Sequence, residues 1–138
     1  MKMKVAILTA SAGLLAAVMP ALAHHSFAAE YDSEKKVTIT GKVLKVELVN
    51  PHSWIHVMAA GPDGKTQDWA CEFGPPNGLY RNGWNKTSVK EGDTITVNGS
   101  LAKNGSPTIN ASQITTADGK RLFAGSSENN AGVAVPKQ

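Results

Sequence analysis

The chain has 138 residues, a formal net charge of +3 and one cysteine. This length allows one domain of ordinary size, and 41% hydrophobic with 18% charged residues is typical of a globular chain. A single cysteine excludes an intramolecular disulfide, a CxxC redox pair and a multi-cysteine zinc site. The common nucleotide-binding, metalloprotease and serine-hydrolase motifs are absent from the sequence, so no motif indicates a reaction.

Residues 1–23 have the pattern of a secretory signal peptide. Lys2 and Lys4 form a positive start, Val5 to Met19 is an uncharged and mostly apolar run, and Ala21 to Ala23 is an A-x-A cleavage site. The run is shorter than the roughly 20 residues of a membrane-spanning helix. We therefore expect cleavage, a periplasmic or secreted protein, and no stable membrane anchor after cleavage.

Cleavage would change the charge of the working protein. It removes two of the 14 basic residues and no acidic residue, which leaves +1. Nucleic-acid binding needs clustered Lys and Arg, so the mature chain is not expected to bind nucleic acid.

The mature chain alternates in the way that β-strands do. We expect a lead-in over residues 24–36, a barrel domain over residues 37–123 and a flexible tail over residues 124–138. Within the barrel, strands are predicted over residues 37–49, 53–59, 66–73, 94–101 and 108–116, with a short helical segment within residues 74–88. This order predicts an all-β fold, a small five-stranded OB-like barrel with the helical segment between strands three and four. A small sandwich and an SH3-like barrel are the alternatives.

Alternation also predicts which side chains are buried. In the third strand Trp69, Cys71 and Phe73 share one face, so Cys71 is expected to be a buried, inert thiol. In the first strand the apolar phase slips after Leu44, which is typical of a β-bulge.

The four histidines lie in two places. His24 and His25 would form the new N-terminus, where the α-amine (pKa near 7.7–8.0) and an imidazole can chelate one metal. A nitrogen-rich site of this kind favours copper(II), with His25 or His56 as a further ligand. The alternative is a flexible polar start with incidental metal affinity.

His52 and His56 are four residues apart. On an extended strand this spacing separates them by roughly 13 Å, so they should not share one ion. His52 is expected to order the turn or cap a strand end. His56 is expected to lie outward beside Trp54, oriented by Asp68 or Glu72.

A ligand or partner surface is predicted around the outward-facing residues of the second and third strands. Its members are His52, Trp54, Glu72 and Asn77, the last from the GPPNGLYRNGW stretch. The partner could be a small ligand, a metal ion or a periplasmic protein, and none is specified by the residues.

Four stretches of the sequence resemble one family: HHSFAAEYD, VELVNPHSWIHV, WACEFGPPNGLYRNGW and DGKRLFAGSS. The resemblance is to bacterial exported proteins classed as domain of unknown function 6152. It implies a small exported β-barrel without an established activity. It also marks His24, His25, His52 and the Asn50–Pro51 turn as positions of the family pattern.

Three functions follow as hypotheses. The first is a non-catalytic binding or accessory protein, with copper held by the N-terminal histidines. The second is an interaction module of a larger periplasmic or membrane-bound complex. The third, an enzyme using histidine and carboxylate groups, is disfavoured because no nucleophile, base and orienting group stand together in the sequence.

Overall fold

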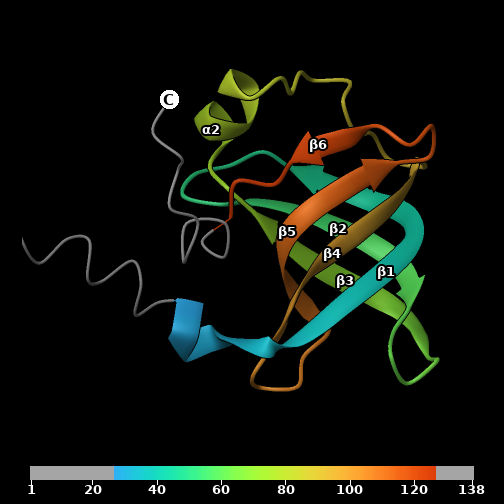
Figure 1. Ribbon diagram of the computed structural model, residues 1–138. Coiled ribbons are helices and arrows are strands. Elements are labelled where there is room, and N and C mark those ends of the chain that lie inside the picture. The colour runs from blue at the N-terminus through green and yellow to red at the C-terminus, as the bar shows by residue number, and fades with distance from the viewer. Residues whose placement is uncertain (1–26, 127–138) are drawn as a thin grey trace, which may run out of the picture.

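The computed structural model describes residues 27–126, and β-strands make up most of this part of the chain (Figure 1). The predicted signal peptide, both N-terminal histidines and residues 127–138 lie outside the described residues. A helical turn over residues 27–30 leads into the first strand. The elements are β1 (Tyr31–Glu47), β2 (Ser53–Ala60), β3 (Thr66–Phe73), α2 (Pro76–Arg81), β4 (Thr94–Ala102), β5 (Thr108–Thr116) and β6 (Arg121–Phe123).

Five of these strands close into a ring. β1 pairs antiparallel with β2 and β4, β2 pairs with β3, and β4 pairs with β5. A parallel pairing of β3 with β5, from Ala70–Thr108 to Glu72–Asn110, completes the ring. β6 pairs with the far part of β5. The predicted all-β, barrel-like fold is confirmed, with three strands, a short helix and then two strands around the ring.

The interior of the ring is filled by alternate side chains, because successive residues of a strand point to opposite faces. In β3 the predicted inward set of Trp69, Cys71 and Phe73 is buried. In β2 Ile55 and Val57 are fully buried, whereas His56 between them is only partly buried. The largest fully buried apolar side chains are Phe73, Ile39, Ile55, Leu79, Ile95, Ile109, Ile114, Val57 and Val97.

β1 is long and bent, as its sequence pattern predicts. Its register against β2 shifts between Val43 and Lys45, which confirms the predicted bulge. The strand nevertheless begins at Tyr31 and not at Val37, because Tyr31 and Asp32 pair with the end of β4. The predicted lead-in therefore contains the first part of a paired strand, which its polar composition concealed.

The other end of the domain also differs from expectation. The sequence predicts a flexible tail over residues 124–138; residues 127–138 lie outside the described residues, and Ala124 and Ser126 are buried. The Gly74 N–H donates to the Ala124 carbonyl at 2.9 Å, and the Ser126 hydroxyl donates to the Ala111 carbonyl. The chain thus continues to pack on the ring through residue 126, and α2 and β6 lie at the same end of the molecule (Figure 1).

Candidate functional site

A buried carboxylate, Glu72, is the centre of the candidate site. It lies in β3 between Cys71 and Phe73, so its side chain points out of the ring while theirs point in. Glu72 is only 5% exposed. Glutamate is almost never fully buried unless it is paired, so the groups around it are informative.

Three donors from three other parts of the fold meet this carboxylate. The Tyr31 hydroxyl of β1 donates to Oε2, and the Asn110 amide of β5 donates to the same oxygen at 3.3 Å. His52 Nδ1, from the turn before β2, contacts Oε1. These hydrogen bonds stabilise the buried charge of Glu72.

Tyr31 belongs to a short segment that lies against the ring, residues 27–31, which we term the strap. The Phe27 and Tyr31 rings stack with centroids 5.8 Å apart, and both residues are buried. On the other side the Lys103 N–H donates to the Glu30 carbonyl at 2.8 Å, and the Lys103 ammonium donates to the Ala28 carbonyl. The strap is thus held between the β4–β5 loop and Glu72.

Tyr31 remains a hydrogen-bond donor under ordinary conditions. Burial raises the pKa of its hydroxyl well above the usual value, and the hydrogen bond to Glu72 and the charge of Glu72 raise this pKa further. The protonated phenol therefore points at the carboxylate throughout the neutral range.

His52 presents one ring nitrogen to Glu72 and leaves the other directed away from it. Its side chain is 42% exposed, in contrast to Glu72. Because a carboxylate only accepts hydrogen bonds, contact with Glu72 favours the neutral tautomer in which Nδ1 carries the proton and Nε2 the lone pair. Metal-binding histidines are oriented in this way by a carboxylate.

His56 forms a separate and more exposed pair. Its Nδ1 lies 3.0 Å from Asp68 Oδ1, and its Nε2 lies 3.8 Å from Glu47 Oε2. His52 and His56 thus contact different carboxylates. Asp68 and Glu72 are the two predicted partners of His56. His56 contacts Asp68, whereas Glu72 contacts His52. Within the described residues no three His, Cys, Asp or Glu side chains are grouped so as to hold a metal ion.

Trp54 is half-buried and forms part of a groove of about 530 Å³. Tyr31, Glu30 and residues of the β4–β5 loop, including Lys103, complete its walls. Neither His56 nor Glu72 lines this groove, so it does not assemble the histidine and carboxylate groups of the enzyme hypothesis. Asn77 is exposed on α2 and is not one of the donors to Glu72.

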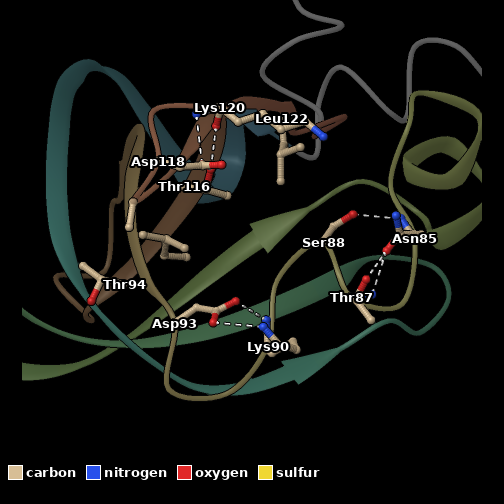
Figure 2. Close-up of a pocket in the computed structure, with 12 residues that line it drawn as sticks. Asn85, Thr87, Ser88, Lys90, Asp93, Thr94, Thr116, Asp118, Lys120 and Leu122 are labelled. Carbon is tan, nitrogen blue, oxygen red and sulfur yellow. Dashed lines mark hydrogen bonds and ion pairs between the residues drawn. The ribbon is translucent and has the colours of Figure 1, made fainter.

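A second hollow of about 470 Å³ lies between the loop before β4 and the turn between β5 and β6 (Figure 2). Asp93 accepts from the Lys90 backbone and ammonium, and Asp118 accepts from the Thr116 hydroxyl and the Lys120 N–H. These local hydrogen bonds lower the pKa of both carboxyl groups. The same hydrogen bonds stabilise the two turns in which Asp93 and Asp118 lie.

Cys71 is not a reactive group. It is fully buried, and burial raises the pKa of its thiol to about 12. A reactive cysteine needs an exposed and electropositive setting, so the prediction of a buried core residue is confirmed on its burial.

Tyr31 and Asn110 were missed from the sequence. Tyr31 sits in a polar stretch assigned to the lead-in, and no local pattern marks it. Asn110 did carry a signal, because it is a polar residue between Ile109 and Ala111 in a strand whose neighbours are buried. Its burial between apolar neighbours requires a polar partner.

Fold and site together define a small all-β ring protein with a buried carboxylate that orients a half-exposed histidine. The sequence matches the family of unknown function DUF6152 over residues 11–110, and the chain belongs to that family. A comparison with curated proteins found no match. Between residues 27 and 126, no helix has the length and apolar character needed to cross a membrane.

Proposed function

We propose that this protein is an exported, non-catalytic accessory protein that binds copper(II), with His52 Nε2 as one ligand. The observation that supports the proposal is the contact of His52 Nδ1 with the buried carboxylate of Glu72. This contact holds the imidazole in one tautomer and one orientation, which are the properties that a metal ligand needs.

The N-terminal histidines supply the remaining nitrogen ligands in this proposal. After cleavage behind Ala23, the α-amine and imidazole of His24 chelate the ion and His25 adds a further nitrogen. His24 precedes Phe27 by three residues, a tether of at most about 11 Å. Phe27 stacks on Tyr31, which donates to the same carboxylate that orients His52. Phe27, to which the N-terminal histidines are tethered, therefore belongs to the group of side chains around Glu72 that includes His52.

Copper(II) is the metal that this donor set favours. Amine and imidazole nitrogens in a planar arrangement suit copper(II), which also binds more tightly than the other divalent first-row metals. His56 supports this role less well, because both of its nitrogens face surface carboxylates. It therefore serves as the matched control.

The test uses the protein purified after export. Intact mass should place the mature N-terminus at His24, and competition titration with copper(II) then gives the affinity. Loss of an outer-shell partner alone costs 10- to 100-fold in metal affinity, so His24→Ala and His52→Ala should each weaken binding by about 100-fold or more. His56→Ala should leave the affinity within about threefold, since it removes no proposed ligand.

Two results would overturn the proposal. A mature N-terminus other than His24 removes the amine chelate. An unchanged copper affinity in His52→Ala removes the contribution of the oriented imidazole. Nitrogen hyperfine structure in the electron paramagnetic resonance spectrum gives an independent count of nitrogen ligands, and that count should fall by one in His52→Ala.

A further inference from the structure

Glu72 is a shared acceptor, and this links two parts of the molecule that are distant in sequence. One of its oxygens contacts His52, and the other accepts from Tyr31 of the strap and from Asn110. Tyr31 and Glu72 are 41 residues apart, and both are buried. Anything that moves the carboxylate therefore acts on all three partners.

Resting on the proposed copper site, we propose that Tyr31 is a positioning residue for His52, acting through Glu72, so that metal binding and docking of the strap stabilise each other. A carboxylate can rotate about its terminal torsion, which is broad and has no sharp staggered minima. Donation from Tyr31 to Oε2 restrains this rotation and keeps Oε1 directed at His52 Nδ1.

The restraint is strengthened by the surroundings of Tyr31. Its ring is held by stacking on Phe27 and by pairing of its backbone with Ala102 of β4. Asn110, which is fully buried, supplies a second hydrogen bond to the same oxygen. The orientation of His52 thus depends on groups that do not touch the metal.

Coupling of this kind is reciprocal. If docking of the strap raises the affinity of the site for metal by some factor, metal binding stabilises the docked strap by the same factor. The strap is therefore expected to open less often in the metal-bound protein. The Lys103 amide reports on this directly, because it donates to the Glu30 carbonyl of the strap and exchanges with solvent when that hydrogen bond opens.

The experiment is a double-mutant cycle on the exported, mature protein. Copper(II) affinity is measured for the wild type, Tyr31→Phe, His52→Ala and the double variant, with Tyr80→Phe as a control on an exposed tyrosine. We expect Tyr31→Phe to weaken binding by about tenfold, the lower end for outer-shell partners, and to have no effect when His52 is already absent. Tyr80→Phe should leave the affinity unchanged.

A second measurement needs no variant and remains informative if Tyr31→Phe folds poorly. Hydrogen exchange of the wild-type protein is compared with and without copper(II), and the metal should slow exchange of the Lys103 amide, which donates to the Glu30 carbonyl of the strap, by about tenfold. Exchange at β6, which includes none of the Glu72 partners Tyr31, Asn110 and His52, should not change.

The outcomes separate this inference from the proposed function. If His52→Ala leaves the affinity unchanged, the copper site itself is wrong. If His52→Ala weakens binding but Tyr31→Phe does not, or weakens it equally without His52, the coupling is refuted and the site stands. Unchanged exchange of the Lys103 amide on addition of copper also refutes the coupling.

Discussion

Removal of one oxygen atom tests the buried cluster most directly. Tyr31→Phe deletes the hydroxyl that donates to Glu72 and preserves the ring that stacks on Phe27. Hydrogen bonds to charged groups contribute about 1.5 to 3 kcal/mol each. Because Tyr31 is 4% exposed, water cannot replace the lost donor, so we expect the free energy of unfolding to fall by about 1.5 to 3 kcal/mol.

Urea denaturation of the mature protein measures this change. With a slope of about 1.5 kcal/mol/M for a domain of this size, the midpoint should fall by about 1 to 2 M and the slope should stay constant. Tyr80→Phe is the matched control, since Tyr80 is 41% exposed and its change should stay within about 0.5 kcal/mol. Equal midpoints for the two variants would refute the claim that the Tyr31–Glu72 bond stabilises the fold.

Three further predictions concern the rest of the domain. Gly99→Ala should lower the free energy of unfolding by about 1 to 3 kcal/mol, because a Cβ there would lie 2.1 Å from the backbone carbonyl oxygen of Asn110. The control is Gly78→Ala in α2, where the nearest atom would be 3.7 Å from the new Cβ. This variant should be neutral or stabilising in the same urea assay. Cys71 should resist a thiol-specific disulfide reagent at about pH 8 in the native state and react fully in denaturant, and rapid labelling of the native protein would contradict its burial. The pKa of Asp118 is lowered on folding, so its contribution to stability is present above the unfolded pKa of 3.8 and is lost as the pH falls through the lower folded value. Asp118→Asn should therefore reduce the dependence of unfolding midpoint on pH below about pH 4, and an unchanged dependence would count against this hydrogen-bonded turn.

Local patterns were sufficient for most of the ring. The predicted strand over residues 108–116 has the bounds of β5, and the predicted core face of β3 is buried. Alternation also predicted that His56 would lie beside Asp68 or Glu72, because neighbouring antiparallel strands place outward residues side by side, and His56 contacts Asp68. These features depend on residues that are close in sequence or on adjacent strands joined by a hairpin.

The site depended on contacts that local patterns do not contain. Alternation placed Glu72 on the outward face, which is correct, and on that basis it was expected to be accessible. It is buried because the strap begins β1 at Tyr31 and contacts it, and because the β3–β5 pairing sets Asn110 beside it.

By itself, then, the sequence determined the all-β order, the inward and outward faces of the strands and the inert core position of Cys71. Each of these follows from the two-residue period of a strand and from the burial of apolar side chains. Only the tertiary structure decided that His52, and not His56, receives the support of Glu72. The reason is physical: closing the ring and docking the strap bring together residues 38 and 41 positions apart, and a period of two residues carries no information about such distances.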